Sequence, residues 1–251
     1  MNDSTASKSH RVAVVTGGSR GIGAAVCRSL AAEGFFVVIN YREARSRAEA
    51  LAGEILSRGG QADIFGADVS RSKDADALIS FAAEKGALDV LVCSAGIAGQ
   101  KLFDEISDAE WEHMIGVNLS GTFYVCRAAA KEMIRSKRGS IVTVSSMWGV
   151  VGASCEVHYS AAKAGVIGLT KALAKELGPS GVRVNCVAPG VIDTEMNAHL
   201  SQNDLSALAE STPLCRIGTP EEIADAVTFF ATERSSFVTG QILTADGGFS
   251  V

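Results

Sequence analysis

The sequence predicts an α/β domain with a doubly wound, parallel sheet of seven strands and helices on both of its faces. Short apolar segments rich in β-branched residues alternate with longer segments of helical periodicity along the chain. The short segments are continuously apolar, which indicates strands that are buried on both faces between two layers of helices. Because no linker, repeat or low-complexity segment interrupts this order, we expect a single domain over residues 11–251 after a flexible tail at residues 1–10.

The predicted elements follow one another at short intervals. Strands are expected at residues 12–15, 35–39, 62–65, 90–93, 141–144, 182–187 and 242–244. Helices are expected at residues 21–32, 43–58, 73–85, 108–137 and 157–177, the fourth with a bend near Asn118. A further helix begins after Thr219, since Thr219, Pro220 and Glu222 match the N-cap, N1 and N3 positions of a capping box. The irregular stretch 191–217 has the length of a functional lid.

Composition and charge argue against several classes of protein. The formal net charge is −5, whereas a nucleic-acid-binding protein usually has a basic surface. No apolar run reaches the ~18 residues of a membrane span, and the first ten residues lack the apolar core of a secretory signal. We therefore expect a cytoplasmic protein that binds neither nucleic acid nor membrane. Six scattered cysteines and four histidines show no disulfide or metal-ligand spacing, so no metal site is expected.

A glycine-rich turn, residues 16–23, joins the first predicted strand to the first helix. It reads Thr16-Gly17-Gly18-Ser19-Arg20-Gly21-Ile22-Gly23. Glycines allow a sharp turn and a close approach to a pyrophosphate, and the unpaired N–H groups of the helix N-terminus attract it. The spacing is G-x-x-x-G-x-G, and the strand before it and the helix after it favour a dinucleotide site.

The end of the second strand predicts which dinucleotide binds. An acidic residue that would accept from a ribose 2′-hydroxyl is absent there, and the chain reads Asn40-Tyr41-Arg42 instead. Arg42 and Arg20 could clamp a 2′-phosphate through charge-assisted hydrogen bonds, or both could be solvated surface residues. The clamp predicts NADP(H) in preference to NAD(H).

A serine, a tyrosine and a lysine form the predicted catalytic set. Tyr159 and Lys163 lie four residues apart in a predicted helix and so share one of its faces. A phenol has a reference pKa of about 10, and a nearby ammonium is expected to lower the pKa of Tyr159. Ser146 follows the fifth strand, where its hydroxyl can bind a substrate carbonyl. All three residues are expected at the carboxyl ends of the strands, where such sheets bind ligands.

Together these motifs resemble the short-chain dehydrogenase/reductase family over residues 10–249, which implies an NAD(P)-binding Rossmann fold. The matching segments are the glycine turn, Asp68-Val69, Ala95-Gly96, Val117-Asn118, Ser146, Tyr159-Ser160-Ala161-Ala162-Lys163 and Pro189-Gly190 through Thr194. The resemblance implies that Tyr159 is the general acid for carbonyl reduction and that Lys163 lowers its pKa and holds the nicotinamide ribose. It also implies that Ser146 orients the carbonyl and that Asn118 carries a water linking Lys163 to solvent.

The resemblance further implies the cofactor contacts. Asp68 and Val69 would meet the adenine, and Ile192 and Thr194 the nicotinamide carboxamide and the phosphates. The candidate cofactor-binding residues are Gly17, Ser19, Arg20, Gly21, Ile22, Gly23, Asn40, Tyr41, Arg42, Asp68, Val69, Ser94, Ala95, Gly96, Asn118, Tyr159, Lys163, Pro189, Gly190, Ile192 and Thr194. Ser94 departs from the family, which usually has Asn before Ala-Gly, and a hydroxyl offers fewer hydrogen bonds than an amide.

Within the family the chain is most similar to 3-oxoacyl-[acyl carrier protein] reductases. This similarity implies a 3-oxoacyl thioester as substrate, an acidic acyl carrier protein as partner, and a homotetramer. Lys137 and Arg138 match one basic place at which such enzymes meet the carrier, but they also suit a solvated helix C-terminus. The second such place reads Pro179-Ser180-Gly181 and carries no charge.

The segment from Ser146 to Tyr159 also resembles a subgroup assigned as elongation factor P 5-aminopentanone reductases. Glu156, three residues before Tyr159, could pair with a cationic amine, or could simply favour the first turn of the helix. The candidate substrate contacts are therefore Ser146, Trp148, Glu156 and Tyr159. A dehydrogenase of small ketones and alcohols is another alternative, and a non-catalytic dinucleotide sensor is an alternative of a different class. The complete catalytic set favours an enzyme.

Small residues recur along the helix that carries Tyr159. Ala161, Gly165, Gly168 and Ala172 form a stripe. The stripe allows a close approach either to a second subunit, as the resemblance implies, or to the chain's own sheet, and periodicity does not separate the two.

Overall fold

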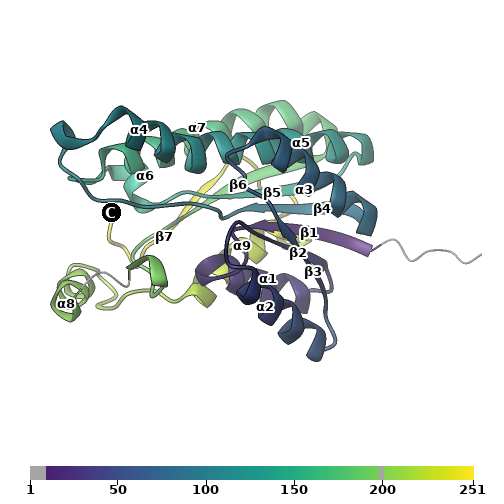
Figure 1. Cartoon of the computed structure of the whole chain (residues 1–251), viewed down its shortest axis with the longest axis horizontal. Helices are drawn as coiled ribbons and strands as arrows, with labels where there is room; N and C mark the ends of the chain where they lie inside the picture. The colour runs from purple at the N-terminus through teal and green to yellow at the C-terminus, as the bar shows by residue number, and fades with distance from the viewer. Residues whose placement is uncertain (1–9, 198–200) are drawn as a thin grey trace, which may run out of the picture.

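A computed structural model of the chain describes residues 10–197 and 201–251 (Figure 1). The described residues form one parallel sheet in the order β3-β2-β1-β4-β5-β6-β7. The strands are β1 His10–Thr16, β2 Phe36–Tyr41, β3 Gln61–Gly66, β4 Gly86–Cys93, β5 Gly139–Val144, β6 Val182–Pro189 and β7 Ile242–Ala245. Because the order reverses between β1 and β4, the predicted doubly wound sheet is confirmed. His10 already belongs to β1, and the remainder of the predicted tail, residues 1–9, lies outside the described residues.

Two layers of helices cover the sheet (Figure 1). One layer consists of α1 Gly21–Ala32, α2 Arg45–Ser57 and α9 Pro220–Ala231. The other contains α3 Ser72–Lys85, α5 Gly121–Ser136 and α7 Val157–Leu177. In β1, Ala13 and Val15 join the core under the first layer, whereas Val12 and Val14 join the core under the second. Both faces of the strand are therefore buried, which explains the continuous apolar runs.

Several helix ends lie where the local sequence predicts them. α1 and α7 span the predicted residues, and the Thr219 hydroxyl caps α9 by accepting from the Glu222 amide at 3.3 Å. The predicted helix 108–137 is divided into α4 Asp108–Ile115 and α5 by a π-helical turn, η2 Gly116–Ser120, which contains Asn118. The expected bend near Asn118 is thus a wider turn of the helix.

Two helices were not predicted. α6 Met147–Val151 begins directly after Ser146, whose hydroxyl caps it by accepting from the Trp148 amide. The prediction that residues 191–217 are irregular throughout is wrong, because α8 Gln202–Glu210 forms there behind a capping box of Ser201 and Asp204. Short 3-10 turns occur at Phe103–Glu105, Gly178–Ser180, Glu195–Asn197 and Glu233–Ser235. Within residues 10–197 and 201–251, no helix combines the length and the apolar character that a membrane crossing requires.

Candidate active site

The predicted catalytic residues meet at the carboxyl edge of the sheet. Ser146 follows the end of β5, and Tyr159 and Lys163 lie on the first turns of α7. All three side chains are buried, with residue exposures of 7%, 8% and 5%. The Ser146 hydroxyl hydrogen-bonds to the Tyr159 phenol, and the Lys163 ammonium lies 5.7 Å from the centre of the Tyr159 ring. The structure therefore brings the predicted set together.

The pKa of Tyr159 differs from the sequence expectation. Burial raises the pKa of the phenol to about 12, the hydrogen bond from Ser146 lowers it, and the negative charge of Glu156 raises it further. The expected lowering by Lys163 is not seen; its ammonium donates to the Val144 carbonyl at 3.0 Å and lies 5.7 Å from the centre of the phenol ring. The phenol is consequently held protonated at neutral pH, which is the form that a general acid needs.

Lys163 is itself shifted by its surroundings. Burial lowers the pKa of the ammonium to about 8, and the thiols of Cys186 and Cys93 oppose this shift. The Val144 carbonyl supplies a hydrogen bond that partly replaces the lost water. Lys163 therefore remains mostly charged at pH 7, close to the range in which it can lose its proton.

Asn118 is fully buried in the π-helical turn. Its amide donates to the Ile97 carbonyl at 3.0 Å and to the Met114 carbonyl at 3.2 Å, and its oxygen accepts from the Ile97 amide at 3.2 Å. A Cβ placed on Gly96 would lie 2.7 Å from that oxygen and 3.4 Å from the Lys163 nitrogen. Asn118 thus holds the chain after β4 against Lys163, and Gly96 allows this close approach.

The glycine turn has the form that a dinucleotide pyrophosphate requires. Gly17 has a φ of +63°, and a Cβ there would lie 2.8 Å from the Ala95 Cα. A Cβ on Gly23 would lie 2.3 Å from the Gly17 carbonyl oxygen, so only glycine permits the turn to close on itself. The turn leads into the N-terminus of α1 beside the switch point between β1 and β4. The residues present therefore fit a dinucleotide.

Asn40, near the end of β2, hydrogen-bonds to the glycine turn. It is 2% exposed, its side-chain oxygen accepts from the Gly17 amide at 3.3 Å, and its backbone carbonyl accepts from the Gly18 amide at 2.8 Å. Its side-chain nitrogen donates to the carbonyls of Phe65 and Ala67. These bonds give Asn40 a part in shaping the turn, and its neighbour Tyr41 lies over Gly66 at the end of β3.

The two predicted clamp arginines are each paired with a carboxylate. The Arg20 guanidinium lies 3.8 Å from Glu195, and Arg42 lies 2.7 Å from Glu43. Arg47 on α2 forms a second and shorter ion pair with Glu195. Arg42 also helps to lower the pKa of Asp68, whose partial burial raises that pKa and whose hydrogen bonds from Ser70 lower it. Basic groups thus line the region after β2, and the sequence analysis did not identify Arg47 or Glu195.

The remaining predicted cofactor residues surround the same edge. The Thr16 hydroxyl accepts from the amides of Ser94 and Ala95, each at 3.1 Å, so the strand end is held despite the family departure at Ser94. Val69 packs against Gly121 at the start of α5. The others take the following places: Ser19 and Ile22 in the glycine turn, Pro189 at the end of β6, Gly190 against Asp246, Ile192 paired with Gly218, and Thr194 against Gly21.

The candidate substrate residues lie beside the catalytic set. The Glu156 carboxylate accepts from the Gln100 amide at 3.2 Å, and its charge reaches the Tyr159 phenol. Trp148 packs against the buried cluster that contains Tyr159. The ring of Trp148 also meets Phe249, a residue that the sequence analysis did not identify because its position depends on a contact across the fold.

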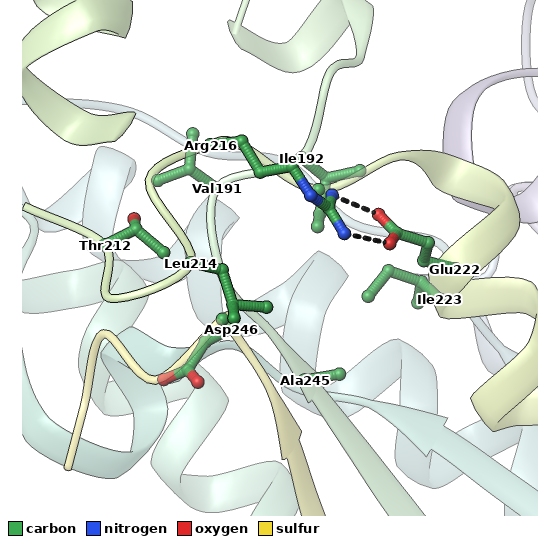
Figure 2. Close-up of a pocket in the computed structure, with 11 residues that line it drawn as sticks. Val191, Ile192, Thr212, Leu214, Arg216, Glu222, Ile223, Ala245 and Asp246 are labelled. Carbon is green, nitrogen blue, oxygen red and sulfur yellow. Dashed lines mark hydrogen bonds and ion pairs between the residues drawn. The ribbon is translucent and has the colours of Figure 1, made fainter. Parts of the chain in front are cut away.

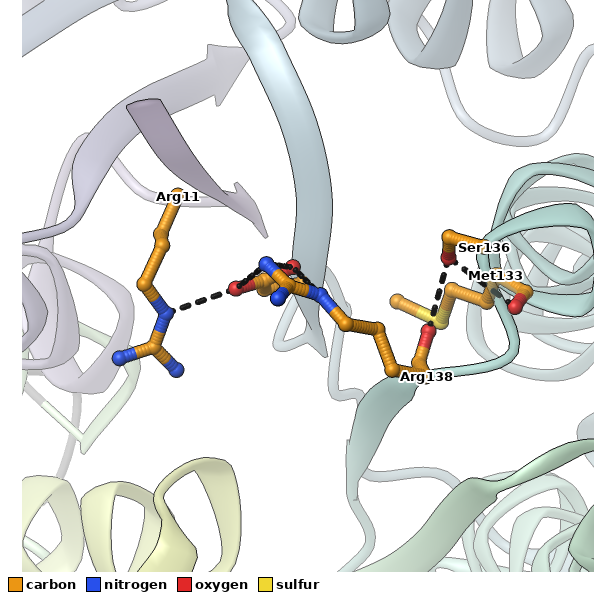
Figure 3. Close-up of polar contacts among 5 residues, drawn as sticks. Arg11, Met133, Ser136 and Arg138 are labelled. Carbon is orange, nitrogen blue, oxygen red and sulfur yellow. Dashed lines mark hydrogen bonds and ion pairs between the residues drawn. The ribbon is translucent and has the colours of Figure 1, made fainter. Parts of the chain in front are cut away.

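The basic pair Lys137–Arg138 does not flank this site within the chain. Both residues precede β5, at the amino edge of the sheet, whereas Tyr159 lies at the carboxyl edge. Arg138 and Arg11 both form ion pairs with the carboxylate of Asp89, at 2.5 Å and 2.7 Å, and the two arginine side chains can be followed in Figure 3. Arg138 is therefore engaged in an ion pair that joins three strands.

A cavity of about 170 Å³ lies at the carboxyl ends of β6 and β7 (Figure 2). Ile192, Leu214 and Asp246 contribute to its lining, and an ion pair between Arg216 and Glu222 crosses its rim. The cavity adjoins the predicted cofactor residue Ile192. Among the described residues, no group of histidine, cysteine and acidic side chains is placed to hold a metal ion.

The chain is similar over nearly its whole length to known reductases. Residues 17–250 match the family model described as enoyl-(acyl carrier protein) reductase. A 3-oxoacyl-[acyl-carrier-protein] reductase of Chlamydia muridarum is 42% identical over 245 residues, which cover 96% of this chain and 98% of the relative.

Two solved structures share the fold over nearly the whole chain. The 3-oxoacyl-[acyl-carrier protein] reductase of Brucella melitensis has a TM-score of 0.91 at 34% identity, covering 98% of this chain and 93% of the other. A putative gluconate dehydrogenase of Agrobacterium tumefaciens has a TM-score of 0.92 at 32% identity, covering 96% of each chain. Because these two proteins are named for different substrates, the shared fold does not by itself identify the substrate.

Proposed function

The chain belongs to the short-chain dehydrogenase/reductase family, whose members are nicotinamide-dependent oxidoreductases, and from this premise we propose that it reduces the ketone of a 3-oxoacyl thioester to a secondary alcohol. The observation that carries the proposal is the burial of Ser146, Tyr159 and Lys163 together at the carboxyl edge, beside the glycine turn. Relatives that match nearly the whole chain and are named as 3-oxoacyl-[acyl-carrier-protein] reductases support it.

The residues divide the chemistry between them. The glycine turn and the N-terminus of α1 bind the pyrophosphate, and the bound dinucleotide supplies the hydride. The hydroxyls of Ser146 and Tyr159 bind the carbonyl oxygen, and Tyr159 donates its proton to that oxygen as the alcohol forms. The raised pKa keeps this proton in place until the far more basic alkoxide develops.

Lys163 and Asn118 complete the proposed proton path. The ammonium of Lys163, whose pKa burial lowers to about 8, is the proposed source of the proton that restores the Tyr159 phenol after proton transfer. Asn118 holds the adjoining backbone and carries a water through which Lys163 recovers a proton from solvent. The same lysine holds the nicotinamide ribose.

The test is the oxidation of NADPH by a 3-oxoacyl thioester. We expect turnover by the wild-type protein and a loss of roughly 10²–10⁴-fold in kcat for Tyr159→Phe, with NADPH still bound. Undiminished turnover by Tyr159→Phe would remove Tyr159 from the mechanism. Retained NADPH binding without reduction of any ketone by the wild-type protein would favour the non-catalytic sensor.

We propose NADPH as the preferred cofactor. Arg20 and Arg42 exchange their carboxylate partners for the 2′-phosphate, which offers more charge and more acceptor oxygens than Glu195 or Glu43. Replacing Arg20 by Gln is expected to lower kcat/KM for NADPH by about tenfold and to leave the value for NADH unchanged. A wild-type preference for NADH would contradict the clamp.

A second candidate substrate is a ketone that carries an amine, such as the 5-aminopentanone group on elongation factor P. The observation that favours it is the Glu156 carboxylate, whose charge is felt at the Tyr159 phenol. Glu156→Gln should reduce the rate with cationic amino-ketones by more than it changes the rate with neutral ketones, because its effect on the Tyr159 phenol is common to both classes. Equal effects on both classes would eliminate this candidate.

Partners and assembly are part of the proposal. Acyl carrier protein is proposed to deliver the thioester, which a lower KM for the carrier-bound than for the coenzyme A-bound substrate would support. We also propose a homotetramer, because Trp111 on α4 and Phe123 on α5 are 42% and 41% exposed and Gly168 on α7 faces open space. Light scattering measures this assembly.

All six cysteines are free, which suits the reducing cytoplasm.

A further inference from the structure

The residues after β7 turn back toward the catalytic edge and form what we call the C-terminal hook, residues 246–250. The Asp246 carboxylate accepts from the amides of Gly248 at 3.0 Å and Ser250 at 2.9 Å, and from the Ser250 hydroxyl at 2.5 Å. Gly247 and Gly248 have φ values of 67° and 90°, a backbone region that favours glycine. The hook is therefore an ordered turn built around one carboxylate.

The hook is tied to the segments on both sides of the active-site edge. The Gly190 amide donates to the Ala245 carbonyl at 3.0 Å, and a Cβ on Gly190 would lie 2.7 Å from the Asp246 Cα. The Leu214 amide donates to the Gly247 carbonyl at 3.2 Å, and Figure 2 shows Leu214 and Asp246 close together at the cavity. These contacts fix the direction in which the hook points.

At the tip of the hook, Phe249 meets Trp148. The ring centres are 5.5 Å apart and the rings are nearly perpendicular, at 86°, the edge-to-face arrangement that aromatic pairs prefer. Trp148 also packs against the buried cluster of Met114, Tyr159 and Ala162. The Trp148 indole therefore contacts both the buried cluster that contains Tyr159 and the ring of Phe249.

We propose that Phe249 is a positioning residue that holds Trp148 as an apolar wall of the substrate site, so that the C-terminal hook determines which ketone substituents bind. This inference rests on the proposed reductase function. The half-buried indole of Trp148 could adopt more than one rotamer if only the Tyr159 cluster contacted it. The contact with the ring of Phe249 restricts it to one rotamer. Because Trp148 lies two residues after Ser146 and beside Tyr159, a substituent that extends from the reacting carbonyl past Ser146 meets this wall. The ligand class is a ketone with an extended hydrocarbon chain.

The kinetic test compares short and long 3-oxoacyl thioesters. Phe249→Ala is expected to raise KM for the long-chain substrate about three- to tenfold, with kcat, KM for the short-chain substrate and KM for NADPH unchanged. The matched control is Phe237→Ala, which removes a fully exposed ring before the start of β7 and should change none of these values. Equal effects of Phe249→Ala on short and long chains, or no effect on either, would overturn the proposal.

A double variant tests whether Phe249 acts through Trp148. Once Trp148 is replaced by Ala, removal of the Phe249 ring should cause no further rise in KM for the long-chain substrate. Additive losses in Trp148→Ala/Phe249→Ala would overturn the positioning role.

Fluorescence tests the same contact without turnover. The chain has two tryptophans, so the Trp111→Phe variant leaves Trp148 as the sole indole reporter. In that background, Phe249→Ala should shift the Trp148 emission to longer wavelength as the ring becomes hydrated, and Phe237→Ala should not. An unchanged emission would overturn the contact, whereas a shifted emission in a protein that reduces no ketone would contradict the proposed function alone.

Discussion

At Tyr159, burial has a larger effect on the proton than any neighbouring charge. The sequence places an ammonium one helical turn away and so predicts an acidic phenol, but the structure raises the pKa of that phenol to about 12. The difference arises because sequence spacing gives proximity along a helix and does not give the direction of a side chain or its loss of water. A protonated phenol is still the form required for carbonyl reduction.

Lys163 is expected to set the pH dependence of reduction. Burial lowers the pKa of its ammonium to about 8, so the charge is present below that pH and is lost as the pH rises through it. Tyr159, with its pKa raised, stays protonated over this range. We therefore predict that kcat/KM for NADPH, which reports the free enzyme, falls as the pH rises through about 8.

The control for this profile is Lys163→Arg, because a guanidinium keeps its charge. Any residual activity of Lys163→Arg should show no fall near pH 8. A wild-type profile that is flat between pH 7 and pH 9.5 would exclude Lys163 as the titrating group.

At the scale of the elements, local signals identify most boundaries. α1, α7 and the capped start of α9 lie at their predicted residues because glycines and capping side chains act within a few residues of the helix end. α6 has only five residues and forms because the Ser146 hydroxyl caps it where β5 ends. α8 lies in a polar stretch, and the capping box of Ser201 and Asp204 is the sequence signal from which its start could have been predicted.

The glycine turn offers a sharp test of the cofactor site. A side chain on Gly23 would collide with the Gly17 carbonyl at 2.3 Å, so Gly23→Ala must displace the turn that receives the pyrophosphate. We predict a loss of NADPH affinity of about tenfold or more, measured by calorimetric titration. Gly53→Ala is the matched control, because Gly53 lies in α2 with open space around its Cα, and it should bind NADPH normally.

On the scale of the whole molecule, the two edges of the sheet have different tasks. The carboxyl edge gathers the candidate chemistry, whereas the amino edge is held by Asp89, Arg11 and Arg138, which join β1, β4 and the start of β5 (Figure 3). The sequence left Arg138 as either a carrier-docking residue or a solvated residue at a helix C-terminus, because a basic pair before a strand does not reveal a buried carboxylate on the neighbouring strand.

Removal of this carboxylate should affect stability and spare activity. Asp89 is 6% exposed and accepts from both arginines, so Asp89→Ala is expected to lower the free energy of unfolding by about 1–3 kcal/mol. Urea denaturation measures this change, and kcat should remain at the wild-type value. Glu49→Ala breaks the exposed Arg45–Glu49 pair and should lower the free energy of unfolding by much less than Asp89→Ala, because solvent screens an exposed pair. If Asp89→Ala lowered the free energy of unfolding by no more than Glu49→Ala, the proposal that Asp89 stabilises the amino edge of the sheet would be refuted.

The contacts that the sequence did not predict are those between distant segments. Glu195 meets Arg47 across 148 positions, and Phe249, which follows β7, contacts Trp148, which follows β5. No local sequence pattern predicts either contact, because each depends on how a loop is placed at the carboxyl edge of the sheet. By contrast, the parallel sheet follows from the apolar runs, and the catalytic set follows from the Tyr159–Lys163 spacing taken together with the glycine turn and the family resemblance.

The π-helical turn between α4 and α5 makes the length of this region critical. Its Gly121 amide donates to Gly116, five positions back, so the turn holds one residue more than an α-helical turn. Deleting one of these five residues would restore a regular α-helical turn and move Asn118 away from the carbonyls of Ile97 and Met114, to which its side chain donates. Insertions and deletions should therefore be found in the loops that flank this helix and not within Gly116–Ser120.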